Sequence, residues 1–169
     1  MRLTVSELDA HHDRAAFDCG DAALNDFLKK LARQQASRGL SRCYAATAGD
    51  ETRIRGYYAL SAGSIEFRNW PAGLSLPRYP IPVARVGRLA VDTRDQGQGV
   101  GAALLRHALQ TSAVLAEKIG LHAVIVDPKH SQAATFYARY GFRPLQEGGL
   151  TMYLLMSLIR KSFGEMSRN

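Results

Sequence analysis

The chain carries the glycine-rich stretch Gln96-Gly97-Gln98-Gly99-Val100-Gly101, which follows an apolar run at residues 86–91 and opens a run with helical spacing at 100–118. A turn of this kind between a strand and a helix exposes backbone N–H groups at the positive end of a helix dipole. The stretch therefore predicts a site for the phosphates of a nucleotide-like cofactor. The alternative is that the glycines serve only a tight turn and close packing of helix on strand.

Two better-known phosphate motifs fit poorly. A dinucleotide fingerprint requires Gly-x-Gly-x-x-Gly and an acidic residue about 20 residues later. Here the glycines alternate, and the next strand ends at Asp127, which is 26 positions past Gly101. A P-loop is excluded because no Gly-Lys-Ser/Thr follows the glycines.

Length and composition indicate one domain over residues 1–169. Apolar residues make up 46% and charged residues 22%, and no segment approaches the ~20 apolar residues of a membrane span. The first residues lack the apolar core of a secretory signal, so we expect a cytoplasmic protein. Cys19 and Cys43 have no metal-ligand spacing and are interpreted as small core residues, and no metal is predicted.

The net charge of +7 and the pI of about 9.7 predict attraction to polyanions. A CoA-type cofactor or plain solubility would favour the same charge, so composition alone leaves nucleic acid as one option among three.

A basic helix is expected in the first third of the chain. Asp21 is placed as its N-cap, and apolar residues fall at Leu24, Phe27, Leu28 and Leu31, so the helix should run to about residue 38. Its other side carries a group that we call the basic stripe: Lys29, Lys30, Arg33 and Arg38, with Arg42 just beyond. The stripe is either a solvated helix face or a contact surface for a polyanion.

Strands are predicted at 42–48 and 54–61, with 65–67 as a continuation, and four prolines between 70 and 82 indicate a surface loop. A strand at 83–91, a helix from Gly99 to Gly120 and a strand at 121–126 form a βαβ unit with parallel strands. Further elements are a helix capped by Ser131 and ending near residue 140, a last strand at 150–158 and a frayed tail at 162–169. The fold class is therefore α/β with a mixed sheet.

The region from Val83 to Phe142 resembles the GCN5-related N-acetyltransferase (GNAT) family. The resemblance is carried by Gln96-x-x-Gly99-x-Gly101 after a strand, then Asp127-Pro128 and Phe136-Tyr137-Ala138-Arg139-Tyr140-Gly141-Phe142. It implies a GNAT fold, in which helices flank a central mixed sheet that is splayed between its fourth and fifth strands. It also implies acetyl-CoA as cosubstrate, with the pyrophosphate on Gln96, Gly97, Gln98, Gly99, Val100, Gly101 and Ala102 and the pantetheine arm along Leu89, Ala90 and Val91.

A closer resemblance spans nearly the whole chain. Phe17-Asp18-Cys19-Gly20, Leu24-Asn25-x-Phe27-Leu28, residues 82–92 and Phe136-Tyr137 look like the GNAT toxins of type II toxin–antitoxin modules. This resemblance implies acetylation of the free α-amino group of aminoacyl-tRNA, which blocks translation. It also implies a ribbon-helix-helix antitoxin and a homodimer.

Acetyl transfer to an amine needs a neutral amine, a donor for the developing oxyanion and an acid for the leaving thiolate. Tyr137 is our candidate acid, at the position that the resembled family uses, and Tyr140 is its competitor in the same predicted helix. A backbone N–H of residues 89–91 is the expected oxyanion donor. Residues 83–91 contain no carboxylate, but an α-amino group titrates near ~7.7–8 against ~10.4 for lysine, so a base is not required. Glu66 acting through water stays open as one.

Arg85 and Arg88 flank the expected site and, with the basic stripe, are predicted to guide a tRNA acceptor stem. His107, His122 and His130 are interpreted as surface or core residues. Two other functions stay open: acetylation of a protein N-terminus, polyamine or other small amine, and a non-enzymatic nucleic-acid-binding role with a vestigial cofactor site.

Overall fold

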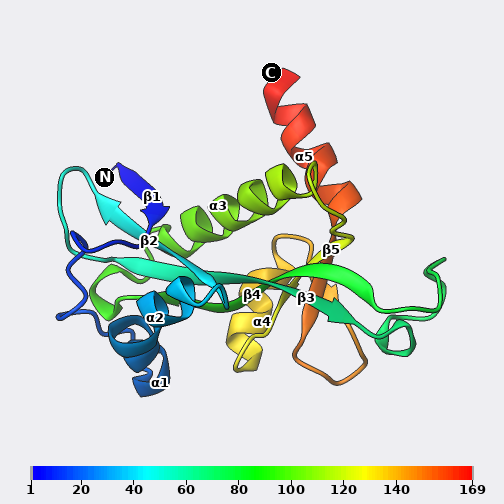
Figure 1. Cartoon of the computed structure of the whole chain (residues 1–169), viewed down its shortest axis with the longest axis horizontal. Coiled ribbons are helices and arrows are strands. Elements are labelled where there is room, and N and C mark those ends of the chain that lie inside the picture. The colour runs from blue at the N-terminus through cyan, green and yellow to red at the C-terminus, as the bar shows by residue number, and fades with distance from the viewer. Residues whose placement is uncertain (1, 169) are drawn as a thin grey trace. The chain divides into compact units, whose positions relative to one another are not determined.

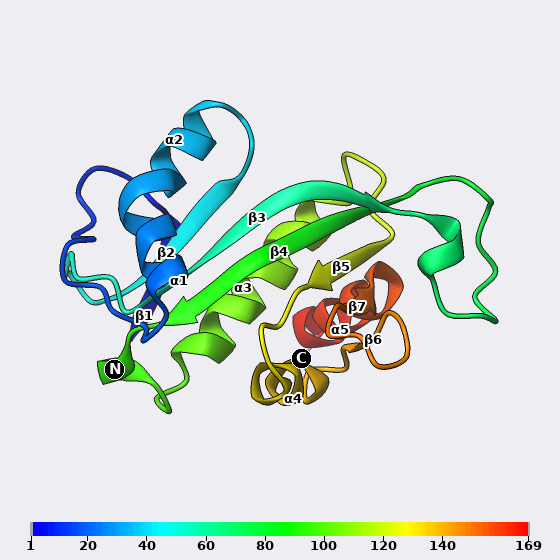
Figure 2. The same ribbon diagram turned by 90° about the horizontal axis from the view of Figure 1, so that it is seen from below.

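Among the described residues, seven strands form one mixed sheet in the order β1-β2-β3-β4-β5-β7-β6, in which β4 and β5 pair in parallel. The structure is a computed structural model that describes residues 2–168. Figures 1 and 2 show the strands together with the helices that flank them. The predicted α/β class with a mixed sheet is confirmed.

The strands are β1 (Leu3–Glu7), β2 (Arg42–Ala48), β3 (Gly56–Ile65), β4 (Ile81–Val91), β5 (Ala123–Val126), β6 (Arg143–Pro144) and β7 (Met152–Leu155). The helices are α1 (Ala22–Asp26), α2 (Ala32–Ser37), α3 (Val100–Leu115), α4 (Ser131–Ala138) and α5 (Met156–Arg168). A π-helical segment, η1 (Phe27–Leu31), joins α1 to α2, and two 3-10 turns are η2 (Phe67–Asn69) and η3 (Thr93–Asp95). None of the helices described is both long and apolar enough to cross a membrane.

The chain divides into two compact units, Met1–Ser61 with Gly87–Ala108, and Ala62–Val86 with Leu109–Asn169. In the first unit, β2 pairs antiparallel with both β1 and β3. Its core is built around Phe17, Phe27 and Tyr57, all at most 2% exposed, and the Tyr57 hydroxyl donates to the Leu24 carbonyl at 2.7 Å. This bond fixes the basic helix to the sheet.

The basic helix begins where the sequence places it, because the Asp21 side chain accepts hydrogen bonds from the N–H groups of Ala23 and Leu24. Its buried face differs from the prediction at one position. Leu31 is 43% exposed, whereas Ala32 is fully buried. A π-helical turn adds one residue to the helix and shifts every later side chain along its surface. The regular spacing that predicted a buried Leu31 therefore fails after η1.

Gly56 allows α3 to pack closely on the sheet. A Cβ atom at this position would lie 2.8 Å from Leu104 Cδ1, 2.9 Å from the Ala90 carbonyl oxygen and 3.0 Å from Val100 Cγ1. These contacts are too short for a side chain. The glycine at the start of β3 thus sets the position of the first turns of α3.

In the second unit, β4 and β5 pair from Val83↔Ala123 to Val86↔Val126, and β7 pairs antiparallel with β5. The predicted loop between β3 and β4 is confirmed except that β4 already begins at Ile81. Trp70, 7% exposed, fixes this loop by donating its indole N–H to the Ile65 carbonyl.

The end of the chain corrects the sequence interpretation. The strand predicted at 150–158 ends at residue 155, and residues 162–168 of the predicted tail belong to α5, while residue 169 lies outside the described residues. Met156 and Ile159 are buried three residues apart while Leu158 is 53% exposed, which is helical spacing. Strands β1 and β6 were missed, and α3 ends at Leu115 instead of near 120.

Candidate functional site

The turn between η3 and α3 has the backbone that phosphate binding requires. Gly97 and Gly99 have φ angles of 78° and 84°, in the left-handed region. A Cβ atom on either glycine would meet nothing within 4 Å, so these two glycines serve the turn conformation and not close packing. The Gly99 carbonyl accepts the first helical bond, from the Ala103 N–H at 3.1 Å. The N–H groups of the first helical turn are therefore without partners inside the helix.

The glutamine side chains of the turn fold back onto the backbone. Gln96 donates its amide to the Val91 carbonyl at 3.1 Å, and Gln98 donates to the Arg94 carbonyl at 3.3 Å. Residues 96–99 are all exposed. The turn is therefore accessible to a ligand, and the assignment of these residues to a pyrophosphate stays a prediction.

A buried carboxylate anchors η3 immediately before this turn. Asp95, 2% exposed, accepts two hydrogen bonds from Arg53, at 2.8 and 3.1 Å, and one from Arg55 at 2.7 Å. The bond from Arg53 is the main cause that lowers the pKa of Asp95. The sequence did not predict this anchor. A hint lay in the order Arg53-Ile54-Arg55, in which two arginines flank an apolar residue that the structure buries.

A second carboxylate fixes the end of β4. Asp92 is fully buried, and its side chain binds the Arg94 guanidinium through both oxygens and accepts the N–H groups of Arg94 and Asp18. The bonds from Arg94 are the leading cause that lowers the pKa of Asp92 to about 2. Asp92 and Asp95 thus hold both ends of η3 in place.

Strand β4 continues past its pairing with β5. The parallel ladder ends at Val86↔Val126, where β5 itself ends, whereas β4 runs on to Val91. The segment Leu89–Val91, which was predicted to lie along a pantetheine arm, belongs to this extension. The parallel pairing thus ends where β5 ends, and the splay that the resemblance implies stays a prediction.

Tyr137 is a buried side chain of α4, only 6% exposed. Its ring makes edge contacts with Phe136 and Phe142, at centroid distances of 5.1 and 5.6 Å. Burial, and to a smaller extent the charge of Asp127, raises the pKa of the phenol above its usual value. The hydroxyl therefore keeps its proton at neutral pH. The competitor Tyr140 is 43% exposed.

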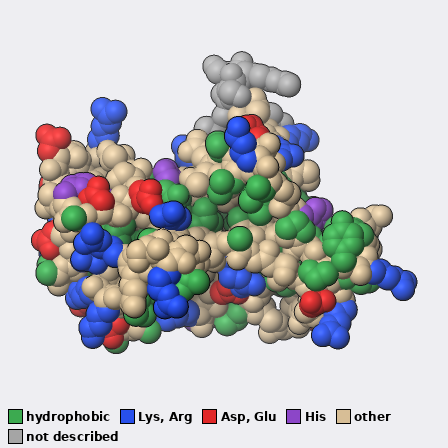
Figure 3. All heavy atoms as spheres, in the orientation of Figure 1, with side chains coloured by type: hydrophobic (Ala, Val, Ile, Leu, Met, Phe, Trp, Pro, Cys, Tyr) green, Lys and Arg blue, Asp and Glu red, His purple; other side chains and the backbone are tan. Residues whose placement is uncertain are grey.

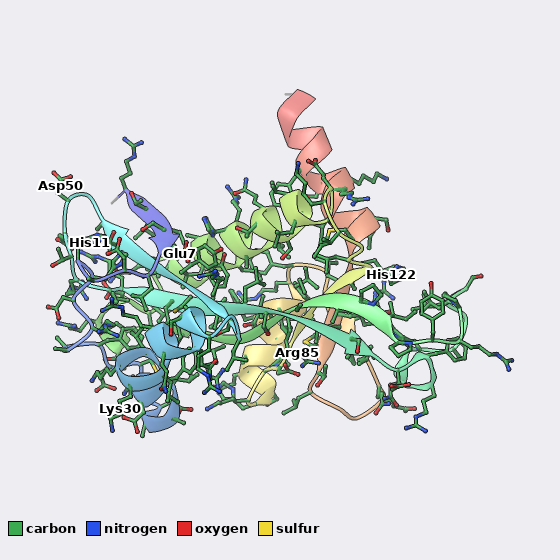
Figure 4. The ribbon with its side chains drawn as sticks, in the orientation of Figure 1. Glu7, His11, Lys30, Asp50, Arg85 and His122 are labelled. Carbon is green, nitrogen blue, oxygen red and sulfur yellow. The ribbon has the colours of Figure 1, made fainter. Side chains whose placement is uncertain are left out.

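The chain reversal after β5 carries an ion pair. Asp127 accepts a hydrogen bond from the guanidinium of Arg85, on β4, and another from the Thr151 hydroxyl at 3.0 Å. The sequence had placed Asp127 at the end of a strand and in the Asp127-Pro128 pair of the GNAT resemblance, and had assigned Arg85 to tRNA contact, but it had not linked the two residues. Figure 4 labels Arg85.

Most of the basic stripe is exposed. Lys30, Arg33, Arg38 and Arg42 face solvent and Lys29 is half-buried. Two of them make surface ion pairs, Lys30 with Asp26 at 3.6 Å and Arg42 with Glu7 at 3.4 Å. Figure 3 shows Lys and Arg side chains gathered where Figure 1 places α1 and α2, and Figure 4 labels Lys30. Arg88, in contrast, lies with its guanidinium carbon 3.9 Å from the centre of the Phe27 ring.

The three histidines have structural partners. His130, and not the predicted Ser131, caps α4, because its Nδ1 accepts the Ala133 N–H at 3.1 Å. His107 Nδ1 lies 2.7 Å from the Tyr58 hydroxyl, and His122 packs edge-on against Trp70.

Cys43 is buried and Cys19 half-buried, and both are free thiols.

Away from the turn, the possible ligand atoms of Asp9, His11 and His12 lie within 4.8 Å of one another, close enough for a cation. The sequence had suggested no metal ligands there.

Comparison with known proteins places these features in a family. The model of the acetyltransferase (GNAT) domain matches residues 39–144. A tRNA-acetylating toxin from Mycobacterium tuberculosis is 35% identical over 163 residues, which cover 95% of each chain. The structure of AtaT complexed with acetyl-methionyl-tRNAfMet is 32% identical with a TM-score of 0.87, and covers 96% of this chain and 99% of that one. A mutant AtaT toxin bound to the C-terminus of the antitoxin AtaR and to acetyl-CoA is 32% identical with a TM-score of 0.81, covering 95% and 98%. The chain belongs to the GNAT family of acetyltransferases.

Proposed function

We propose that this acetyltransferase transfers the acetyl group of acetyl-CoA to the α-amino group of aminoacyl-tRNA and thereby inhibits translation. The observation that carries the proposal is similarity over nearly the full length of both chains to a protein named for tRNA acetylation. The likeness to AtaT, solved with an acetylated methionyl-tRNA, supports the same substrate class. The net charge of +7 suits a polyanionic substrate.

Acetyl-CoA supplies an activated acetyl thioester and a pyrophosphate. The exposed turn fits the pyrophosphate, because Gly97 and Gly99 adopt left-handed conformations and the N–H groups of the first turn of α3 have no partner within the helix. We assign the pyrophosphate to residues 96–102 and the pantetheine arm to Leu89–Val91. A backbone N–H of that strand segment would then donate to the developing oxyanion.

Tyr137 acts in this mechanism as the general acid. As the C–S bond breaks, the Tyr137 hydroxyl gives its proton to the leaving sulfur, and the amine nitrogen gives one proton to a base as its bond to carbon forms. Two features support this role. Burial keeps the phenol protonated until it is used, and the contacts with Phe136 and Phe142 limit its ring orientation.

The RNA would be held mainly through its phosphates. The exposed members of the basic stripe would give affinity and salt sensitivity without reading sequence, and Lys30 and Arg42 would exchange their surface ion pairs for RNA phosphates. Arg85 and Arg88 belong to the same proposal, although each already has a partner within the chain, Asp127 and Phe27 respectively.

The proposal includes partners and a compartment. A relative has been solved with the C-terminus of its antitoxin. We infer that an antitoxin neutralises this chain as well, that it is of the ribbon-helix-helix type, that the enzyme is a homodimer and that it works in the cytoplasm as a single domain.

The substrate class can be tested with acetyl-CoA labelled in the acetyl group. Purified protein and a pool of aminoacyl-tRNA should give label on the amino acid, and the label should leave the RNA when the ester bond is hydrolysed at mild alkaline pH. Uncharged tRNA is the matched control and should stay unlabelled. Label in a polyamine or a protein N-terminus, with none in any aminoacyl-tRNA, would replace this function with acetylation of another amine.

A further inference from the structure

The contacts of Asp127 go beyond what the proposed mechanism uses. This residue directly follows the last residue of β5, and its carboxylate accepts hydrogen bonds from Arg85 and Thr151. The side chains of Arg85 and Asp127 are 31% and 35% exposed. An ionised carboxylate offers about four acceptor positions, so two bonds leave capacity for a further donor. The group is therefore both held in place and accessible.

The ion pair is not needed to align the strands that carry it. Arg85 lies within the β4–β5 ladder, opposite Ile125, and the ladder already fixes both strands through backbone hydrogen bonds. Partly exposed ion pairs contribute little to stability, because solvent screens them. A role in stability alone gives little reason to keep a carboxylate here.

Asp127 is also electrostatically linked to Tyr137 within the same compact unit. Its negative charge adds to the effect of burial in raising the pKa of that phenol. The helix that carries Tyr137 begins at Ser131, four positions after Asp127. Glu66, the carboxylate that the sequence had left open as a water-relayed base, is exposed at the start of η2.

We propose that Asp127 binds the α-amino group of the acceptor and takes the proton that its nitrogen loses. This inference rests on the proposed function. In the balanced step the N–C bond forms and the C–S bond breaks. The nitrogen proton passes to the Asp127 carboxylate, and the Tyr137 proton passes to sulfur. Water then returns the proton from Asp127 to Tyr137. A carboxylate suffices as base because the nitrogen becomes much more acidic once it is bonded to the carbonyl carbon.

The test compares kcat and KM of four proteins with labelled acetyl-CoA and aminoacyl-tRNA. Asp127→Asn should lower kcat about 100-fold and raise KM for aminoacyl-tRNA, because a neutral amide neither accepts the proton nor attracts an ammonium ion. KM for acetyl-CoA should not change. Arg85→Gln breaks the same ion pair but keeps the carboxylate, so its kcat should fall far less, by about threefold at most. Glu147→Gln, an exposed carboxylate of the same unit, is the control.

Asp127→Glu keeps the assay decisive if Asp127→Asn does not fold. Glutamate preserves the charge but moves the carboxylate by one methylene, so kcat should fall about tenfold with an unchanged melting temperature. Equal kcat losses in Asp127→Asn and Arg85→Gln would overturn the inference, because the ion pair itself would then be the requirement. Wild-type kcat in Asp127→Glu would overturn it too. A wild-type enzyme that labels no aminoacyl-tRNA would overturn both the proposed function and this inference. If the wild-type enzyme does label aminoacyl-tRNA, the kcat values of the variants test the role of Asp127 alone.

Discussion

Arg53 and Asp95 form a two-point ion pair, with one guanidinium nitrogen on each carboxylate oxygen at 2.8 and 3.1 Å. Asp95 is buried, and it lies one residue before the glycine-rich stretch that begins at Gln96. The pair therefore connects the entry of β3 to the turn assigned to the pyrophosphate. The pair restrains the residue that precedes the turn before any ligand arrives, and a preorganised site loses less entropy when it binds.

Asp95→Asn should weaken this anchor and the binding of acetyl-CoA together. The substitution leaves the guanidinium groups of Arg53 and Arg55 facing a neutral amide, and hydrogen bonds to charged groups are worth about 1.5–3 kcal/mol. We expect the free energy of unfolding to fall by about 2 kcal/mol and the Kd for acetyl-CoA to rise, measured by urea titration and calorimetry. Asp50→Asn, an exposed carboxylate in the turn between β2 and β3, is the control. Unchanged binding in Asp95→Asn would separate the anchor from the site.

Acid should destabilise the same region through Asp92. Its folded pKa of about 2 lies below the usual value of about 3.9 for the unfolded chain. A carboxyl group with a depressed folded pKa contributes stability that is fully present above the unfolded pKa and is lost as pH falls toward the folded one. Urea unfolding should therefore lose stability between about pH 4 and pH 2. Asp92→Asn should be less stable at neutral pH and should flatten that part of the profile, and an equally steep profile in this variant would assign the acid sensitivity elsewhere.

Gly99→Ala tests whether the glycine-rich turn binds acetyl-CoA, and Gly39→Ala is its control. Gly99 and Gly39 both have positive φ angles, 84° and 71°, and both have open space where a Cβ would stand. Alanine at either position should cost about 1–2 kcal/mol of stability, since L residues avoid this region. Only Gly99→Ala should weaken acetyl-CoA binding, by about tenfold, because it changes the direction of the N–H groups before α3. Equal Kd values in calorimetry for the two variants would show that the turn is not the phosphate site.

The sequence was sufficient for elements whose signals are local. The glycine turn, the Asp21 cap and the strand–helix–strand order around α3 depend on residues close together in the chain, and the structure contains all three. The anchors of the site are not local. Arg53 and Asp95 are 42 positions apart, and so are Arg85 and Asp127. No spacing rule connects such pairs before the sheet brings them together.

Two errors have local physical causes. Leu31 is exposed because η1 adds one residue to the helix, a defect that the hydrophobic pattern does not report. Met156 and Leu158 follow the apolar residues of β7, so this segment was interpreted as strand, although α5 begins at Met156. Short apolar runs do not distinguish strand from helix.

Tyr137→Phe should abolish most turnover while leaving the fold intact. Phenylalanine keeps the ring packing against Phe136 and Phe142 and removes only the proton donor. We expect kcat to fall by about 10²–10⁴, with the Kd for acetyl-CoA and the melting temperature nearly unchanged. Tyr140→Phe is the control. Tyr140 is exposed and lies two residues after the end of α4, so loss of its hydroxyl should leave kcat at the wild-type value. A larger loss in Tyr140→Phe would reverse the assignment of the acid.

The basic stripe predicts a specific salt dependence. Each protein cation that neutralises an RNA phosphate releases counterions, and contributes about 0.7–0.9 to the slope of log affinity against log salt. Replacing Lys30, Arg33 and Arg38 with Gln should therefore reduce that slope by about two to three in filter binding with aminoacyl-tRNA. KM for aminoacyl-tRNA should rise at low salt, whereas KM for acetyl-CoA should stay constant. Substituting Arg160 and Lys161, exposed cations of α5, removes two positive charges instead of three and should leave the slope nearly unchanged if the stripe is the RNA contact. Equal slope changes in the two sets would mean that overall charge, and not this helix, attracts the RNA.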